Sequence, residues 1–71
     1  MRVQLIKNGL ITKQMFDIVS VHSDKKYGYF VVTQKTLHHQ IITIHRFSDV
    51  DYVVLVNRDG TRKEIHQWLM H

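Results

Sequence analysis

Apolar and polar residues alternate along most of the chain, which is the pattern of half-buried β-strands. The alternating or apolar runs cover residues 1–7, 10–14, 16–22, 27–33, 37–47 and 52–57. Short polar segments separate these runs, β-branched residues are frequent in them, and proline is absent from the whole chain. The pattern predicts a mainly β protein made of short antiparallel strands.

The dipeptide Asn8-Gly9 lies between the first two runs and predicts a tight hairpin. Both residues tolerate the positive φ of a type I′ turn, and a two-residue loop pairs Ile6 with Ile11. Near Met15 the apolar pattern changes phase. A bulge or bend at that point explains the change.

A second hairpin is predicted around the polar tetrad of residues 23–26, which separates two apolar runs. Alternation then divides the side chains between two faces. The core face carries Val19, Val21, Phe30 and Val32. The outer face carries Ser20, His22, Tyr27 and Tyr29, beside the loop lysines Lys25 and Lys26.

The next strand, residues 37–47, follows a predicted turn at residues 34–36. Its register against residues 27–33 stays open, because a loop of three or of four residues fits and a slip of one residue exchanges the faces. Residues 48–51 predict another turn. Residues 52–57 then form a nearly continuous apolar strand, expected to be the most buried.

Two patterns compete at the C-terminus. Asp59-Gly60 predicts a tight hairpin that pairs Val54 with Ile65. The capping-box pattern of residues 61–64 predicts a helix start instead. The favoured interpretation is a strand directly after the turn and a short helical turn in the last residues, and the alternative stays open.

Short strands joined by tight turns predict a small antiparallel β-barrel, or a strongly bent sheet, of SH3-like or OB-like type. The chain of 71 residues makes a single domain, 1–71, because it has no room for a second core. Cysteine is absent, so neither disulfides nor cysteine-ligated zinc stabilise the fold. With no signal-peptide pattern and no apolar run near 20 residues, a cytoplasmic location is expected.

The balance of charges is basic. Ten Lys and Arg against six Asp and Glu give a net charge of +4 at pH 7. Such a balance favours a nucleic acid or an acidic protein surface as partner. It is equally the ordinary charge of a small domain that stays in solution.

Candidate catalytic and metal-binding residues are few. Asp49 and Asp51 lie in a predicted turn, which explains both carboxylates. His39 and His45 share a strand face, but six residues of strand separate them by about 20 Å, too far for one ion. We therefore expect no enzymatic activity, no metal and no cofactor.

Tyr27 and Tyr29 are the best functional candidates, because they alternate on one face beside the turn lysines. Aromatic platforms on a sheet, with cations that follow the phosphates, bind single-stranded nucleic acid in many proteins. The alternative is that both rings cover a sheet face or pack against the C-terminal segment.

Two short motifs resemble the cold-shock domain, an OB-fold barrel. The run SDKKYGYF at residues 23–30 is similar to its binding strand, whose pattern is serine, acid, lysine, glycine, aromatic, glycine, aromatic, aliphatic. The run ITIHRFS at residues 42–48 is similar to its second motif: aliphatic, aromatic, aliphatic, histidine, aromatic, serine. The likeness covers roughly residues 18–50.

The resemblance implies base stacking on Tyr27, Tyr29, His45 and Phe47 and a phosphate contact for Lys25. The chain departs from the family where Lys26 replaces a glycine, Thr43 replaces a stacking phenylalanine and Arg46 is inserted. The candidate nucleic-acid-binding residues are Lys25, Lys26, Tyr27, Tyr29, His45, Arg46 and Phe47.

The alternative function is a protein-interaction module, such as an inhibitor or adaptor. Exposed aromatic clusters serve protein hot spots as well. Edge strands of a small sheet also allow homodimerisation or β-augmentation. A phage or mobile-element protein would fit this size and lack of chemistry.

Overall fold

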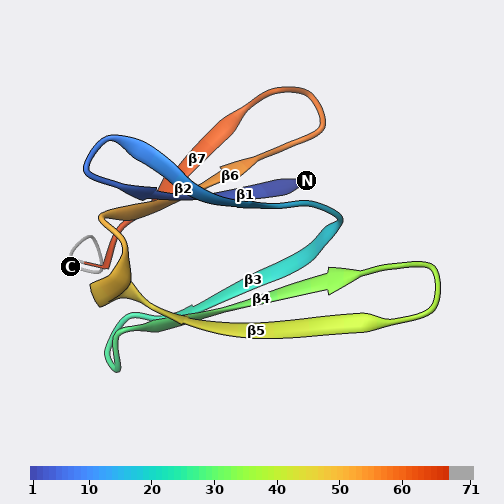
Figure 1. Ribbon diagram of the computed structural model, residues 1–71, viewed down its shortest axis with the longest axis horizontal. Helices are drawn as coiled ribbons and strands as arrows, with labels where there is room; N and C mark the ends of the chain where they lie inside the picture. Colours follow the sequence, from blue (N-terminus) through green and yellow to red (C-terminus); the bar gives the residue numbers. More distant parts are fainter. Residues whose placement is uncertain (68–71) are drawn as a thin grey trace.

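The computed structural model describes residues 1–67, which form seven β-strands and one 3-10 turn (Figure 1). The strands make two antiparallel sheets. The four-stranded sheet has the order β2-β1-β6-β7, with β1 Arg2–Lys7, β2 Leu10–Met15, β6 Tyr52–Val56 and β7 Arg62–Ile65. The three-stranded sheet has the order β3-β4-β5, with β3 Ile18–Asp24, β4 Tyr29–Lys35 and β5 Gln40–Arg46. The turn η1, Phe47–Asp49, connects β5 to β6.

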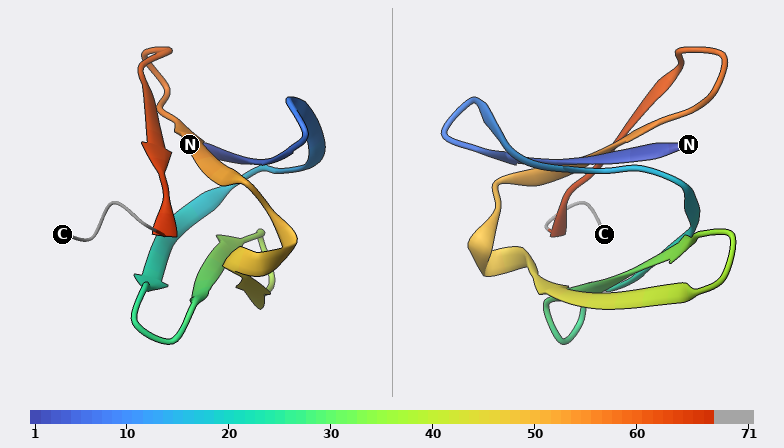
Figure 2. Two further views of the ribbon diagram at one scale, coloured as in Figure 1. Left: turned by 90° about the vertical axis from the view of Figure 1, so that its left-hand side faces the viewer. Right: turned by 45° about the vertical axis from the view of Figure 1, so that its right-hand side comes forward.

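The two sheets face each other and share one core (Figure 2). The chain passes between them at opposite ends, through the bend after β2 and through η1 (Figure 1). The residues of this shared core are Val3, Leu5, Met15, Ile18, Phe30, Val32, Phe47, Val50 and Val53, and a second, smaller buried cluster consists of Ile6, Val54 and Val56. The predicted mainly β, antiparallel architecture is confirmed, but the described strands form two sheets that do not close into a barrel.

The first hairpin has the predicted turn. Asn8 has φ 54° and Gly9 has φ 76°, the positive values that a type I′ turn requires at both central positions. Ile6 pairs with Ile11, as predicted, and the register shifts between Leu5 and Ile6.

The predicted bend near Met15 is present where β2 ends. Asp17 has φ 56°, a left-handed conformation that turns the chain into the second sheet. Its carbonyl accepts a hydrogen bond from the Lys35 amide at 3.0 Å, and the Met1 carbonyl accepts one from the Ile18 amide at 3.2 Å. Both bonds hold the crossing between the two sheets.

The loop of the second hairpin consists of residues 25–28, not of the predicted residues 23–26. Tyr29 pairs with Asp24, and Phe30 pairs with Ser23. Gly28 supplies a positive φ of 78° at the end of the loop. The observed register differs from the predicted one by an even number of residues. Most side chains of the two strands therefore lie on the face that the sequence predicts.

Val19 is the exception on the predicted core face. Val19 is 52% exposed, because the register of β3 shifts between Ile18 and Ser20 and leaves it without a cross-strand partner. Tyr27 also leaves the predicted strand, since it lies in the loop before β4.

The turn between β4 and β5 lies at residues 36–39, after the predicted position at residues 34–36. The Thr36 amide donates to the His39 carbonyl at 2.8 Å, and the His39 amide donates to Thr36 Oγ1 at 3.0 Å. These bonds close the turn and start β5 at Gln40 instead of residue 37. Phe30 then pairs with His45, which decides the register that the sequence left open.

The last hairpin is one residue out of the predicted register. Ile65 pairs with Val53, not with Val54. The loop has three residues rather than two, because the Asn57 amide donates to the Thr61 carbonyl at 2.9 Å. The strand after this turn is confirmed, and the predicted C-terminal helical turn lies mostly in residues 68–71, outside the described residues. Residues 1–67 contain no helix long and apolar enough to cross a membrane.

Candidate nucleic-acid interface

The candidate interface lies on the outer face of the three-stranded sheet, at the end that carries the β3–β4 loop. Tyr29 is half-buried on this face, and its cross-strand partners are Asp24 on β3 and Arg46 on β5. Tyr27 lies in the loop that precedes β4 and is 73% exposed. Two aromatic side chains and a guanidinium therefore come together from three segments.

The loop lysines are adjacent to the tyrosines. Lys26 Nζ lies 5.5 Å from the centre of the Tyr27 ring, which is within cation–π range. Lys25 immediately precedes it in the same loop. Lys25, Lys26 and Arg46 bring three positive charges to this end of the sheet, where the carboxylates of Asp24 and Asp49 also lie.

Hydrogen bonds hold the loop that presents Tyr27. The Tyr27 amide donates to Asp24 Oδ1 at 3.2 Å, and the Gly28 amide donates to the Asp24 carbonyl at 2.9 Å. The Asp24 carboxylate is thereby used in the turn, as is common for aspartate. It is a structural acid within a basic surface.

Two longer-range contacts support the loop from outside. The Phe47 amide donates to the Gly28 carbonyl at 2.8 Å, which continues the alignment of β5 with β4. Gln67 Nε2 donates to the Lys25 carbonyl at 3.3 Å. A Cβ at Gly28 would lie 3.0 Å from Gln67 Nε2, so glycine also leaves room for this amide. The loop therefore depends on the residues after β7.

A shallow hollow opens between the loop and β5. Its lining residues are Tyr27, Gly28, Tyr29, Ile44, Arg46, Ser48 and Gln67. Aromatic rings, an arginine and small polar groups are the combination that a flat heterocycle attached to a phosphate requires.

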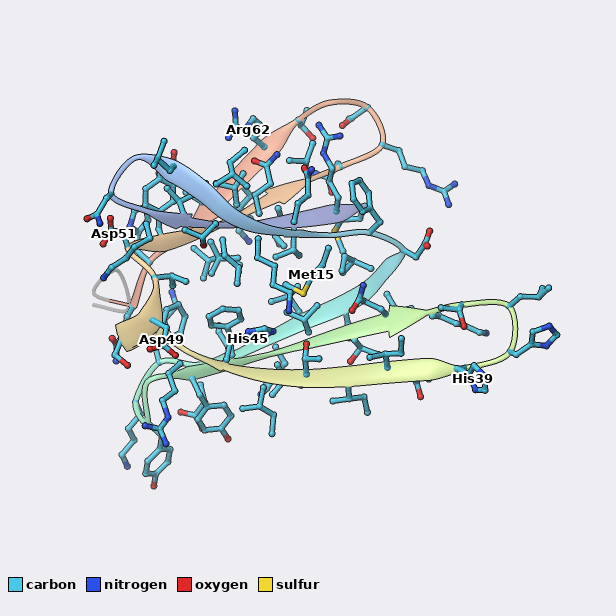
Figure 3. All side chains as sticks on the ribbon, in the orientation of Figure 1. Met15, His39, His45, Asp49, Asp51 and Arg62 are labelled. Atoms are coloured by element: carbon cyan, nitrogen blue, oxygen red, sulfur yellow. The ribbon has the colours of Figure 1, made fainter. Side chains whose placement is uncertain are left out.

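The structure does not bring His45 and Phe47 to this face. Phe47 is 4% exposed and belongs to the core, with its ring centre 5.0 Å from that of Phe30. His45 points into the space between the sheets (Figure 3) and stacks on Phe30 at 5.1 Å with an interplanar angle of 17°. Successive side chains of a strand point to opposite faces. Arg46 lies on the outer face of β5, so its neighbour His45 lies on the inner face. Neither ring is placed to stack with a base bound outside.

The inner position of His45 changes its protonation. Burial lowers the pKa of His45 below the usual 6.5, the charge of Lys13 lowers it further, and Asp49 partly offsets both. Its Nε2 lies 2.9 Å from Thr43 Oγ1 on the same strand. The imidazole is therefore a neutral packing group near neutral pH.

Comparison with protein-family models, with curated proteins and with solved structures finds no match to this chain. The cold-shock likeness therefore stays a prediction from two short motifs.

Sequence reasoning missed the isoleucines next to the tyrosines. Ile42 is 61% exposed and Ile44 is 71% exposed. They pair with Thr33 and Val31 of β4, which places them on the same outer face as Tyr29. The strand pattern contains this information, but only once the register of β5 is known.

A larger hollow than the one beside Tyr29 lies elsewhere, where residues 16–19 approach the β4–β5 and β6–β7 turns. It is lined by Met1, Arg2, Phe16, Asp17, Ile18, Val19, Lys35, Thr36, Leu37, Val56, Asn57, Arg58 and Gly60. Cationic and apolar side chains are mixed in this lining. No nucleophile among these lining residues is in contact with a base. Within residues 1–67 no three histidine or carboxylate side chains are grouped to hold a metal ion.

Proposed function

We propose that this protein binds single-stranded DNA or RNA, without catalysis or a cofactor, at the loop end of its three-stranded sheet. The observation that carries the proposal is the arrangement of Tyr27 and Tyr29 beside Arg46. One ring is largely exposed, the other lies on the sheet, and both line the same hollow.

The chemistry of the hollow supports stacking combined with phosphate contacts. Each base stacked on an aromatic side chain contributes roughly 1–3 kcal/mol and does so for any base. Lys25, Lys26 and Arg46 would contact phosphates, and three such contacts on a single strand give a salt slope of about −2. Binding of moderate affinity and low sequence preference follows.

The architecture is compatible with this proposal. OB-folds, which are small partly open barrels, bind oligonucleotides on a sheet face and its loops. Of the two predicted architectures, SH3-like and OB-like, we therefore propose the OB-like one together with this function. The cold-shock likeness at residues 23–30 coincides with the β3–β4 loop and the first residues of β4.

The second candidate function is recognition of a protein. It is favoured by the exposure of Ile42 and Ile44 beside the tyrosines, because aliphatic side chains contribute little to phosphate-backbone binding. Binding to a protein through these residues would change little with salt, which separates the two candidates.

A titration with labelled oligonucleotides tests the proposal. Binding should be present at low salt and weaken as salt rises. Arg46→Gln should weaken binding and reduce the magnitude of the salt slope by about 0.7. Arg58→Gln, which removes the same charge from the far turn, is the matched control and should have a much smaller effect. Absence of binding at low salt, or equal effects of both variants, would refute the assignment.

A further inference from the structure

Strand β5 is an unprotected sheet edge. Proteins protect edge strands with charges, bulges or short length, because an exposed ladder of amides and carbonyls pairs with other strands. Within residues 1–67, four strands form sheet edges: β2, β7, β3 and β5. The first three are protected and the fourth is not.

The protection of the three other edges is visible in their residues. β2 carries Lys13 and a shift of register against β1. β7 has four residues, of which 62–64 are all charged. β3 shifts its register between Ile18 and Ser20. β5, by contrast, pairs with β4 over seven residues without a shift.

The side chains of β5 are apolar as well as accessible. Its sequence, QIITIHR, has a single Lys or Arg, at the last position, and no carboxylate. Ile41, Ile42 and Ile44 are 44%, 61% and 71% exposed. An exposed edge strand that is rich in β-branched residues and nearly uncharged is the type that pairs with strands of other chains.

We infer that β5 pairs antiparallel with β5 of a second copy of this chain, so that the two three-stranded sheets form one continuous sheet in a symmetric dimer. The sequence of the strand is self-complementary in the register centred on Thr43. In that register Ile42 lies opposite the second copy's Ile44, and each pair is repeated by the twofold axis. Two isoleucines from each copy then form one apolar patch on the outer face.

The charges on β5 favour the antiparallel orientation. Each chain is basic, with a net charge of +4, so two copies repel each other, and this repulsion is smallest when the contact surface carries few charges. In the antiparallel register Arg46 lies opposite the second copy's Gln40, and the two arginines stand about 20 Å apart along the strands. A parallel pairing would set them side by side.

The dimer would also place two candidate nucleic-acid sites on one surface. A twofold axis perpendicular to a shared sheet keeps the outer faces of both copies on the same side. The inference itself rests on the edge and the isoleucines. It does not depend on the proposed binding of nucleic acid.

Sedimentation equilibrium over a range of concentrations tests the association. The mass should rise from 8.5 kDa at low concentration to twice that value at high concentration. Ile44→Lys should abolish the rise, because two lysines would enter the patch. Leu37→Lys is the matched control, since Leu37 is 91% exposed in the β4–β5 turn, outside the ladder, and this variant should still dimerise.

Thr43→Cys tests the register in the same protein. The chain has no cysteine, so the new thiol is the only one, and it would face its symmetry mate at a distance that a disulfide spans. Mild oxidation should give a covalent dimer, whereas His22→Cys, on the opposite edge strand β3, should give little. A mass of 8.5 kDa up to millimolar concentration, a dimer that Ile44→Lys leaves intact, or equal cross-linking of both cysteine variants would overturn the inference.

Discussion

His45 and Arg46 are neighbours in β5, and the pleat sends them to opposite faces of the sheet. Arg46 faces solvent beside Tyr29, while His45 stacks on Phe30 between the sheets. The same alternation that makes Arg46 a candidate ligand residue thus gives His45 a structural role.

His45 should make the stability of the fold sensitive to mild acid. Burial and Lys13 lower its pKa below 6.5 in the folded chain, so the unfolded chain binds the proton more readily. Its contribution to stability is therefore complete above pH 6.5 and is lost as the pH falls from 6.5 toward the lower folded pKa. His45→Phe keeps a stacking ring without a proton site and should flatten this part of the profile.

Urea unfolding measured at several pH values between neutral and mildly acid conditions gives that profile. His39→Gln, in the exposed β4–β5 turn, is the control and should leave the loss of stability in place. A His45→Phe profile as steep as that of the unmodified protein would contradict the account.

Tyr29 should be the stronger of the two stacking residues, because β4 holds its backbone in the sheet. Tyr29→Ala should weaken oligonucleotide binding by about 1–3 kcal/mol, measured by fluorescence anisotropy. Tyr29→Phe keeps the ring and should bind nearly as well. Equal losses in both variants would assign the effect to the hydroxyl and not to stacking.

At the residue scale, the sequence predicts the outward position of Tyr29 but not the buried position of Phe47. Period-two alternation correctly places Tyr29 outside and Phe30 inside, since an even slip of register preserves faces. It could not place Phe47, because that residue begins η1 and turns into the core where the strand pattern ends.

At the scale of elements, the turns decide the registers. Asn8-Gly9 allows one tight geometry, so the first hairpin is predictable from two residues. The tetrad of residues 23–26 does not restrict the loop in this way, because Gly28 supplies the positive φ farther along. Asp59-Gly60 similarly fits loops of two or three residues, and the longer loop is accompanied by two hydrogen bonds that the Asp59 carboxylate accepts from the Thr61 amide and hydroxyl.

The first hairpin gives a direct test of turn conformation. Gly9 has φ 76°, and a Cβ built there meets no atom within 4 Å, so Gly9→Ala changes only the backbone preference. The variant should lose about 1 kcal/mol of unfolding free energy, measured with urea. Gly9→Asn should lose less, because asparagine tolerates the left-handed region. A larger loss in the asparagine variant would contradict the turn assignment.

At the scale of the whole molecule, one core joins two sheets that do not close. Val3 and Val53 come from the four-stranded sheet, and Phe30 and Val32 from the other, and all four side chains are fully buried. Which strands share a sheet depends on long-range pairing, above all that of β1 with β6. Alternation within a strand carries no information on such partners, so the sequence does not decide between a closed barrel and two facing sheets.

The shared core predicts cooperative unfolding of both sheets. Phe30→Ala should cost about 3–5 kcal/mol, a large part of the roughly 5–10 kcal/mol available to a domain of this size. Amide exchange of β1 and β4 should accelerate together in this variant, because each sheet covers the other. Acceleration confined to β4 would show two independent units and contradict the description of one core.

The most direct test of the proposed function is a map of amide chemical shifts during titration with an oligonucleotide. No proline interrupts the chain, so every residue after the first carries an amide that can report. The account predicts that changes gather at residues 24–29 and 44–48, on the loop and the neighbouring end of β5. Changes gathered instead around Arg2, Lys35 and Arg58, or no changes at low salt, would contradict it.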